Sequence, residues 1–420
     1  HAVSWRHTQD CKCREHQPRP SGKTAAAIMS ESYNWPFLTN EETITFLHSY
    51  GRVMFITRGL PGSGKSGIAE AIKEAYPSCK VIHADQMFVG FGAVEKTPET
   101  TIESHLRCQQ KTIEALQKNT PFVMNRNNNA TIRETSKYIE LAASYGYLVI
   151  IIDTFQKELM SAEYLVACNT KLLDTTYINR ALEKWQEVHP LCTGWFLKPS
   201  DRSSLLSHLS LLLKKCAAKD LPMSVKVNAI PGPTFCLARF CWFGIEKSNR
   251  AYFEKVKDAI GTTHLLRVCG YMIENETIYG LVELEGALKE ELADGLPIDS
   301  LGTARWKATC SVEVPPTLFP QPGETGARRM ATLARTSTVP EHASFIVLGN
   351  TSGVTTTPNA PTPKIAEIWQ NVLHETRQIP ASRVEDATAR VGDSVVLILL
   401  DHALCVETIF AGFYQPYISR

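Results

Sequence analysis

The sequence lacks long apolar runs and an excess of either charge. No apolar stretch reaches the roughly 18 residues that a membrane-spanning helix requires, so we expect no such helix. The 44 lysines and arginines are balanced by 43 aspartates and glutamates, for a formal net charge of +1. The composition therefore provides no general attraction to nucleic acid or to anionic membranes.

Cysteine pairs with the spacing of a zinc site are also missing. The 12 cysteines are scattered, and no pair of C-x-x-C motifs recurs along the chain. Cys236 and Cys241 lie in an apolar stretch, where small buried thiols are the simplest interpretation. We therefore expect a cytoplasmic, reducing location and no disulfide framework.

The two ends of the chain differ from its middle. Residues 1–28 are polar, rich in His, Arg and Cys, and show no hydrophobic periodicity. We expect them to be disordered or non-native and to lie outside the fold, with Met29 as a candidate start. The chain ends in Tyr417-Ile418-Ser419-Arg420, which is not a prenylation box, so we expect no lipid anchor at this C-terminus.

Strands and helices alternate in the first half of the chain. The expected strands are 52–57, 80–83, 122–124 and 148–153, and the expected helices are 66–76, 98–118, 131–145, 158–185 and 203–217. The strands are largely apolar, which is typical of strands buried on both faces of a sheet. The pattern predicts an α/β domain over residues 29–217 with a doubly wound parallel sheet.

The second half has a different pattern. Proline and glycine punctuate residues 218–233, which we interpret as a linker. Between 234 and 420 we expect strands at 235–243, 264–273, 277–284 and 344–348, a helix at 363–377, and paired strands at 394–400 and 404–411. Antiparallel pairs predominate, which predicts a second domain of the α+β class.

A glycine-rich loop stands between the first expected strand and the next helix. It matches the P-loop pattern G-x-x-x-x-G-K-[ST] in full, with the residues Gly59, Leu60, Pro61, Gly62, Ser63, Gly64, Lys65 and Ser66. The glycines allow backbone N–H groups to converge on a phosphate, Lys65 adds a positive charge, and Ser66 is a candidate Mg²⁺ ligand. The loop predicts binding of ATP, or of another nucleoside triphosphate, with Mg²⁺.

Three further polar residues stand at the ends of expected strands. Asp85 follows the second strand, where its carboxylate either accepts a proton from a hydroxyl acceptor or caps a helix. Asp153 ends the fourth strand, either as an acid on the metal side of the nucleotide or as a turn residue. Asn129 follows the third strand and either contacts the nucleotide or forms a turn.

Four segments give the sequence a resemblance to a known family. They are Pro36-Phe37-Leu38, Glu41-Glu42-Thr43, Gly194-Trp195-Phe196-Leu197 and Ile409-Phe410-Ala411-Gly412-Phe413-Tyr414, in addition to the P-loop. Over most of residues 29–414 their order and spacing resemble those of the 2′,3′-cyclic-nucleotide 3′-phosphodiesterases. The resemblance implies a polynucleotide-kinase-like P-loop domain, then a two-lobed two-histidine phosphoesterase domain, with RNA or a cytoskeletal protein as partner.

The resemblance also implies a chemistry for the second domain, which needs no cofactor. Two H-x-T motifs on facing strands open a 2′,3′-cyclic phosphate to a 2′-phosphate. One histidine acts as a base towards water and the other as an acid towards the leaving 3′-oxygen, while the two threonines hold the phosphate.

This sequence departs from the family pattern at both H-x-T motifs. Phe235 and Leu237 stand in place of the first histidine and threonine, and Phe345 and Val347 stand in place of the second pair. These side chains can neither move a proton nor hydrogen-bond a phosphoryl oxygen. Because each acid–base group contributes about 10²–10⁴-fold, we expect severely impaired hydrolysis of cyclic phosphates.

The P-loop domain departs from the family as well. After the third strand, the family's Asp-Thr-Asn corresponds to Asn127-Asn128-Asn129, with Arg126 before it, and only Asn129 is retained. We expect nucleotide binding to survive because backbone amides and Lys65 dominate it. Phosphoryl transfer to an acceptor has weaker support.

Three functions remain open. The first is a nucleotide-binding relative with a decayed phosphodiesterase site, that is, a pseudoenzyme in its second half. The second is an active phosphodiesterase that uses His342, three residues before Phe345, which would require a bulge in the strand. The third is a P-loop kinase of a nucleic-acid or small-molecule hydroxyl, with Asp85 as the base.

Overall fold

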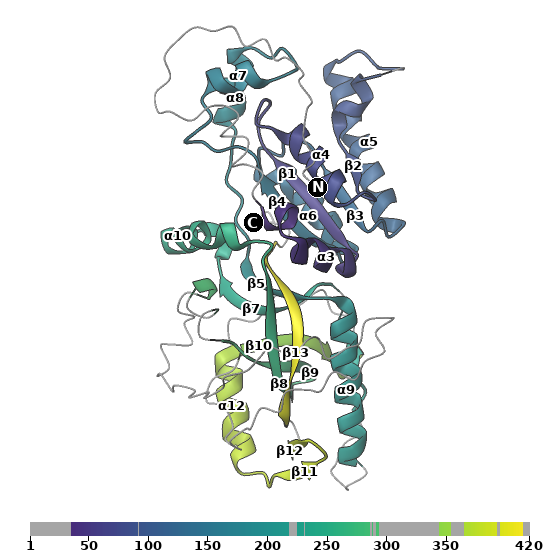
Figure 1. Ribbon diagram of the computed structural model, residues 1–420, viewed down its shortest axis with the longest axis vertical. Coiled ribbons are helices and arrows are strands. Elements are labelled where there is room, and N and C mark those ends of the chain that lie inside the picture. The colour runs from purple at the N-terminus through teal and green to yellow at the C-terminus, as the bar shows by residue number, and fades with distance from the viewer. Residues whose placement is uncertain are drawn as a thin grey trace, which may run out of the picture.

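The computed structural model describes residues 35–90, 92–217, 225–230, 232–285, 288, 291–293, 344–353, 365–392 and 395–414 (Figure 1). Residues 1–28, His342 and 417–420, on which three of the sequence expectations rest, lie outside the described residues. Within the described part of the chain, no helix combines the length and the apolar character needed to cross a membrane.

The first half forms a parallel sheet of four strands. These are β1 (Val53–Arg58), β2 (Lys80–Ile82), β3 (Phe122–Asn125) and β4 (Leu148–Asp153), in the spatial order β2-β3-β1-β4. All four lie at the positions expected from the sequence. Because the strands are parallel, their carboxyl ends meet at one edge of the sheet, where the P-loop begins.

Helices cover both faces of this sheet. They are α2 (Pro36–Thr39), α3 (Glu41–Tyr50), α4 (Lys65–Ala75), α5 (Pro98–Gln117) and α6 (Ile132–Ser144). Helices α7 (Ala162–Cys168) and α8 (Thr175–Glu183) instead lie beyond the end of the sheet, where Leu165 and Ile178 pack with Leu60 of the P-loop (Figure 1). Val53 and Phe55 of β1 pack with α3 and α4, whereas Met54 and Ile56 pack with α5 and α6. This alternation confirms the predicted doubly wound sheet, whose strands are buried on both faces.

The single helix expected over 158–185 is wrong, because a turn divides it into α7 and α8. Asn169 organises the turn: its side-chain oxygen accepts from the Leu173 N–H at 2.9 Å, and its side-chain amide donates to the Leu173 carbonyl at 3.1 Å. Leu172 adopts a left-handed conformation with φ 54°. Side-chain bonds of asparagine to nearby backbone compete with helix formation, and Asp174 then caps α8.

The second half forms an antiparallel sheet that closes on itself. Its strands are β5 (Cys192–Leu197), β6 (Asn228–Ala229), β7 (Thr234–Phe240), β8 (Thr263–Glu274), β9 (Thr277–Glu283), β10 (Ser344–Asn350), β11 (Ser382–Val384), β12 (Ala387–Val391) and β13 (Val395–Phe413). Six of them form a ring in the order β13-β5-β7-β10-β9-β8, because β13 pairs with β8 as well as with β5. Trp195, Cys236, Ile346 and Phe410 lie in the core of this ring.

The helices of this half are α9 (Pro199–Ala217), α10 (Lys247–Val256) and α12 (Ile365–Arg377), with short 3₁₀ turns at η2 (Trp242–Gly244) and η3 (Lys257–Ala259). Leucines of α9 pack into the same core as the ring. This mixture of helices and antiparallel strands confirms the predicted α+β class.

The paired strands expected at 394–400 and 404–411 are instead the single strand β13. Both parts pair with β8, and the register shifts between Leu399 and Leu404. The residues between them, Asp401-His402-Ala403, include no glycine or asparagine of the kind that tight hairpin turns use. The irregularity is therefore a bulge, which bends a strand without reversing it.

Strand β5 connects the two halves of the chain. It precedes the expected linker at 218–233, yet it hydrogen-bonds to β7 and β13 of the second sheet. Its Phe196 lies in one apolar cluster with Phe46 and Phe55 of the first half and Phe413 of the second. The two sheets therefore share a continuous core.

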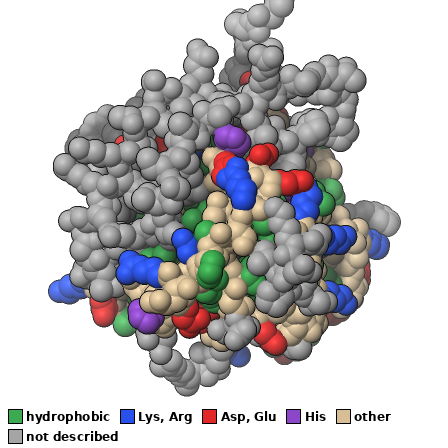
Figure 2. Space-filling view, turned by 90° about the horizontal axis from the view of Figure 1, so that it is seen from below, with side chains coloured by type: hydrophobic (Ala, Val, Ile, Leu, Met, Phe, Trp, Pro, Cys, Tyr) green, Lys and Arg blue, Asp and Glu red, His purple; other side chains and the backbone are tan. Residues whose placement is uncertain are grey.

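The described surface at the end of the molecule farthest from the P-loop shows no dominant charge (Figure 2). Seen from below, it carries basic and acidic side chains close to one another. This agrees with the formal net charge of +1.

Candidate functional site

The P-loop spans the turn from β1 to α4, and close approaches require its glycines. Gly62 and Gly64 have φ values of 88° and 91°, which L side chains rarely adopt. A Cβ atom on Gly59 would lie 2.0 Å from Oγ1 of Thr154, and one on Gly62 would lie 2.3 Å from the Leu165 carbonyl oxygen. The glycines predicted to cradle a phosphate thus occupy positions where other residues do not fit.

Lys65 is the first residue of α4, and its ammonium group lies against the loop. Its Nζ donates to the carbonyl oxygens of Gly59 at 2.9 Å and Leu60 at 2.8 Å. Burial lowers the pKa of Lys65 to about 7, and the positive charges of Lys171 and Arg126 act in the same direction. An anion beside this amine would favour its charged form.

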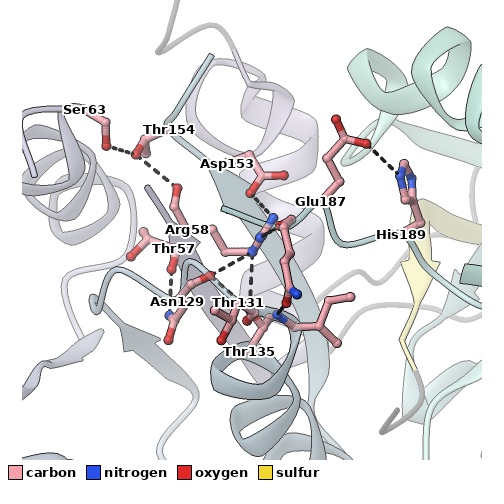
Figure 3. Close-up of polar contacts among 12 residues, drawn as sticks. Thr57, Arg58, Ser63, Asn129, Thr131, Thr135, Asp153, Thr154, Glu187 and His189 are labelled. Atoms are coloured by element: carbon pink, nitrogen blue, oxygen red, sulfur yellow. Dashed lines mark hydrogen bonds and ion pairs between the residues drawn. The ribbon is translucent and has the colours of Figure 1, made fainter. Parts of the chain in front are cut away.

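Hydrogen bonds hold the loop to the neighbouring strand β4. Ser63 Oγ and Thr154 Oγ1 lie 2.7 Å apart, and the Thr154 N–H donates to the Arg58 carbonyl oxygen at 2.7 Å (Figure 3). Ser63 and Pro61 are buried. The Ser63 N–H also donates to the Leu60 carbonyl oxygen at 3.1 Å. Ser63 therefore supports the shape of the loop.

The guanidinium group of Arg58 fixes the end of β1. This side chain is fully buried, and its Nε donates to the Asn129 carbonyl oxygen at 3.1 Å and to Thr135 Oγ1 at 3.3 Å. Its Nη1 donates to Asp153 Oδ1 at 2.8 Å (Figure 3), and the group lies over the Trp185 ring at 4.5 Å. One side chain thus joins β1, β4, α6 and the segment after α8.

Asn129, a predicted nucleotide contact, is buried within this same network. Its side-chain amide donates to the Thr57 carbonyl oxygen and to Asn125 Oδ1, both at 2.7 Å. Its backbone is left-handed, with φ 45°. In this arrangement Asn129 ties the end of β3 to β1, which is the turn-forming role that the sequence also allowed.

Asp85 lies in the 3₁₀ turn η1 (Ala84–Phe88), directly after β2, and is ion-paired with Lys171. The distance between Lys171 Nζ and Asp85 Oδ2 is 2.5 Å. Burial acts to raise the pKa of Asp85, but the hydrogen bond and charge of Lys171 hold it below its usual value. Lys171 comes from the turn between α7 and α8, and no sequence motif marks it.

Arg126 is a second cation that sequence reasoning did not assign to the site. Its Nη1 donates to Ser66 Oγ at 2.9 Å, and its Nη2 lies 2.7 Å from His83 Nε2. Burial, together with the charge of Arg126, lowers the pKa of His83 to about 4. The imidazole is therefore neutral at pH 7, and its Nε2 accepts the bond.

The predicted Mg²⁺ ligands both have cationic partners. The Ser66 hydroxyl accepts from Arg126, and the Asp153 carboxylate is paired with Arg58. Mg²⁺ requires oxygen ligands in a strict octahedral arrangement, and a guanidinium group competes for the same lone pairs. As arranged, Ser66 and Asp153 do not fit Mg²⁺.

The four residues at the H-x-T positions share one face of the ring. Cys236 of β7 pairs with Ile346 of β10, and both point into the core. Their neighbours along the strands point to the opposite face, since side chains alternate along a strand. Those neighbours are Phe235, Leu237, Phe345 and Val347, as the family register predicts.

This face is packed with aromatic rings. Phe235 stacks on Phe196 with ring centroids 4.6 Å apart and contacts Phe413 at 5.0 Å. Phe345 packs edge-on against Trp369 at 5.6 Å and against Tyr279 at 6.1 Å. The four positions therefore offer neither a proton-transfer group nor a hydroxyl.

We predict that Arg58→Met lowers the free energy of unfolding by about 2–3 kcal/mol, because buried partners of the guanidinium lose their hydrogen bonds. Asp153→Asn should cost less than about 1 kcal/mol, since 45% of the Asp153 side chain is exposed. Urea unfolding of the full chain measures both values. Equal losses would mean that the ion pair, rather than the bonds to Asn129 and Thr135, holds the site together.

Comparison with protein families identifies the P-loop half. The sequence pattern of the AAA domain matches residues 54–168. NEDD4-binding protein 2 of Homo sapiens is 30% identical over 138 residues, which cover 32% of this chain and 8% of that protein.

Curated relatives extend the similarity further along the chain. The 2′,3′-cyclic-nucleotide 3′-phosphodiesterase of Mus musculus is 24% identical over 268 residues, covering 58% of this chain and 62% of the relative. That of Pongo abelii is 25% identical over 279 residues, covering 60% and 64%. The match thus spans somewhat less than two thirds of the length of these relatives.

Solved structures of RNA-processing proteins are also similar in part. A chain of the Pnkp1/Rnl/Hen1 RNA repair complex is 18% identical with a TM-score of 0.27, covering 32% of this chain and 43% of that one. A fungal RNA kinase is 10% identical with a TM-score of 0.25, covering 86% and 99%. The sequence comparisons, with the geometry above, confirm the resemblance: this chain is similar to the 2′,3′-cyclic-nucleotide 3′-phosphodiesterases, and its P-loop half matches the AAA domain.

Proposed function

We propose that this chain is a nucleotide-binding relative of the 2′,3′-cyclic-nucleotide 3′-phosphodiesterases whose hydrolytic site has decayed. The observation that carries the proposal is the P-loop with Lys65, whose Nζ lies 2.9 Å from the Gly59 carbonyl oxygen and 2.8 Å from that of Leu60. The ligand class is a nucleoside triphosphate, with ATP as the natural probe.

The chemistry of binding follows from the backbone and from charge. The backbone N–H groups of residues 64–66 stand at the start of α4, where the helix dipole favours an anion. Lys65, Arg126 and Lys171 add positive charge at the same place, since the charges of Arg126 and Lys171 both act on Lys65. A polyphosphate would relieve this mutual repulsion.

The apolar side chains at the H-x-T positions of the second half support the proposed loss of cyclic-phosphate hydrolysis. Opening a cyclic phosphate requires a base, an acid and groups that hold the phosphoryl oxygens. Phe235 and Phe345 hold aromatic rings in packed positions, and Leu237 and Val347 have no hydroxyl. RNA remains a proposed partner by family resemblance.

A second candidate, a P-loop kinase, is favoured by the position of Asp85. A cavity of about 220 Å³ lies between η1 and α5, lined by His83, Met87, Val94, Arg107 and Lys111 among others. It combines basic and apolar side chains, which suits a phosphate-bearing acceptor such as a nucleic-acid end. Asp85 lies in the same turn, η1, and would accept the proton of the attacking hydroxyl.

ATP binding should depend on Lys65 and on pH. Lys65→Ala should weaken binding by about 10–100-fold, the value of a hydrogen bond to a charged group. The pKa of Lys65 is lowered to about 7 and should rise beside a polyphosphate, so the bound state holds more protons. Affinity should therefore fall as the pH rises above about 7.

Isothermal titration calorimetry at pH 8, in buffers of different ionisation enthalpy, measures this proton. We expect uptake of about half to one proton per ATP. The control is Lys65→Arg, whose guanidinium stays protonated and should take up none. Binding that survives Lys65→Ala unchanged would refute the nucleotide site.

Hydrolysis of 2′,3′-cyclic AMP or 2′,3′-cyclic NADP by the full chain should be undetectable. The loss of both acid–base groups, at about 10²–10⁴-fold each, removes the family reaction. A chromatographic assay for the 2′-phosphate product tests this. Hydrolysis that His342→Ala abolishes would instead establish the alternative phosphodiesterase.

The kinase candidate predicts transfer of labelled γ-phosphate from ATP to RNA with a 5′-hydroxyl. Asp85→Asn should reduce this transfer by about 10²–10⁴-fold through loss of the base. Asp258→Asn, at an exposed position in η3, is the matched control and should leave it unchanged. No transfer by the unmodified chain would reject the kinase and leave the binding proposal intact.

A further inference from the structure

The guanidinium group of Arg126 occupies the place beside the P-loop hydroxyl where a nucleotide-bound metal would be expected. It donates to Ser66 Oγ at 2.9 Å. A metal ion ligated by that oxygen would sit about 2.0–2.1 Å from it. Two positive groups would then lie within a few ångströms of each other, and they would repel.

Arg126 is held in this position by the sheet edge and by His83. Its backbone N–H donates to the Ile82 carbonyl oxygen at 2.9 Å, which continues the pairing of β3 with β2. An arginine cannot accept a hydrogen bond and stays charged, so His83 Nε2, 2.7 Å away, must be the acceptor. A neutral imidazole thus directs the guanidinium group at the loop.

The nearby carboxylates are already neutralised by cations. Asp85 is paired with Lys171 at 2.5 Å, and Asp153 is paired with Arg58 at 2.8 Å. Each therefore offers a divalent cation less attraction than a free carboxylate would. The sequence points the same way, because Asn127 stands where the family resemblance places an aspartate, and Arg126 directly precedes it.

We propose that Arg126 takes the part of magnesium at this P-loop, so that the chain binds a nucleoside triphosphate as the metal-free polyanion. The inference rests on the proposed nucleotide-binding function. Arginine binds phosphate oxygens bidentately and is always charged, which suits it to this role. Mg²⁺ would compete with Arg126 for the Ser66 hydroxyl and for the phosphate oxygens, and it is not needed for binding.

The test is the affinity of the full chain for ATP, measured by calorimetry with excess EDTA and with excess Mg²⁺. The affinity of the unmodified chain for ATP in EDTA should be no more than about threefold weaker than its affinity in Mg²⁺. Arg126→Ala should lose about 10–100-fold in EDTA, the value of charged hydrogen bonds, and less in Mg²⁺. Arg133→Ala, at an exposed position of α6, should change neither value.

A second variant keeps the test independent of any folding defect in Arg126→Ala. Ser66→Ala removes the hydroxyl and leaves the guanidinium, so its affinity in EDTA should stay within about threefold of the unmodified chain, because one neutral hydrogen bond is worth little. The inference is overturned if the unmodified chain binds at least about tenfold more weakly in EDTA. It is also overturned if Ser66→Ala loses affinity only in Mg²⁺.

The proposed function can fail separately from this inference. If Lys65→Ala binds ATP as well as the unmodified chain in both solutions, the nucleotide site itself is refuted. If Lys65→Ala abolishes binding while Arg126→Ala changes nothing, the nucleotide site stands and the role of Arg126 is refuted.

Discussion

The buried guanidinium of Arg58 is the interaction on which the P-loop half depends. It lies at the last position of β1, where the strand must end and the loop must begin, and it bonds to Asn129, Thr135 and Asp153. A buried charge is stable only when its donors are satisfied. The segments that supply those acceptors are therefore fixed relative to β1, and the start of the P-loop is fixed with them.

How far the site could be predicted depended on the sequence distance between its parts. The glycines, Lys65 and Ser66 act within eight consecutive residues, so a local pattern identified them. Lys171 reaches Asp85 across 86 residues, and Arg126 reaches Ser66 across 60. Such contacts depend on how a turn and a sheet edge are folded, and no short motif records them. The acids at the strand ends were correctly located, but their cationic partners were not.

The same distinction applies to the second sheet. Strands β7, β8, β9 and β10 were expected from their own residues, whereas β5, β6, β11 and β12 were not. Ring closure requires β13 to pair with β8 on one side and β5 on the other. That pairing depends on a bulge in β13 between Leu399 and Leu404. At this place the sequence predicted a turn between two paired strands. The pairing also joins β5 to this sheet, although β5 lies before the expected linker. Local propensity therefore predicted only some of the strands, and long-range pairing decided which sheet they joined.

The packing of Phe235 relates its apolar side chain to the contact between the two halves of the chain. The ring lies against Phe196 and Phe413, and both of these belong to the cluster that also contains Phe46 and Phe55 of the P-loop half. Aromatic pairs of this kind contribute about 0.5–1.5 kcal/mol beyond their buried area. An imidazole in the same place would lose part of that contact and would also have to remain hydrated to titrate near neutrality. Packing between the two sheets requires an apolar ring at this position, whereas acid–base catalysis requires a hydrated, titratable group. In this chain Phe235 meets the requirement of packing.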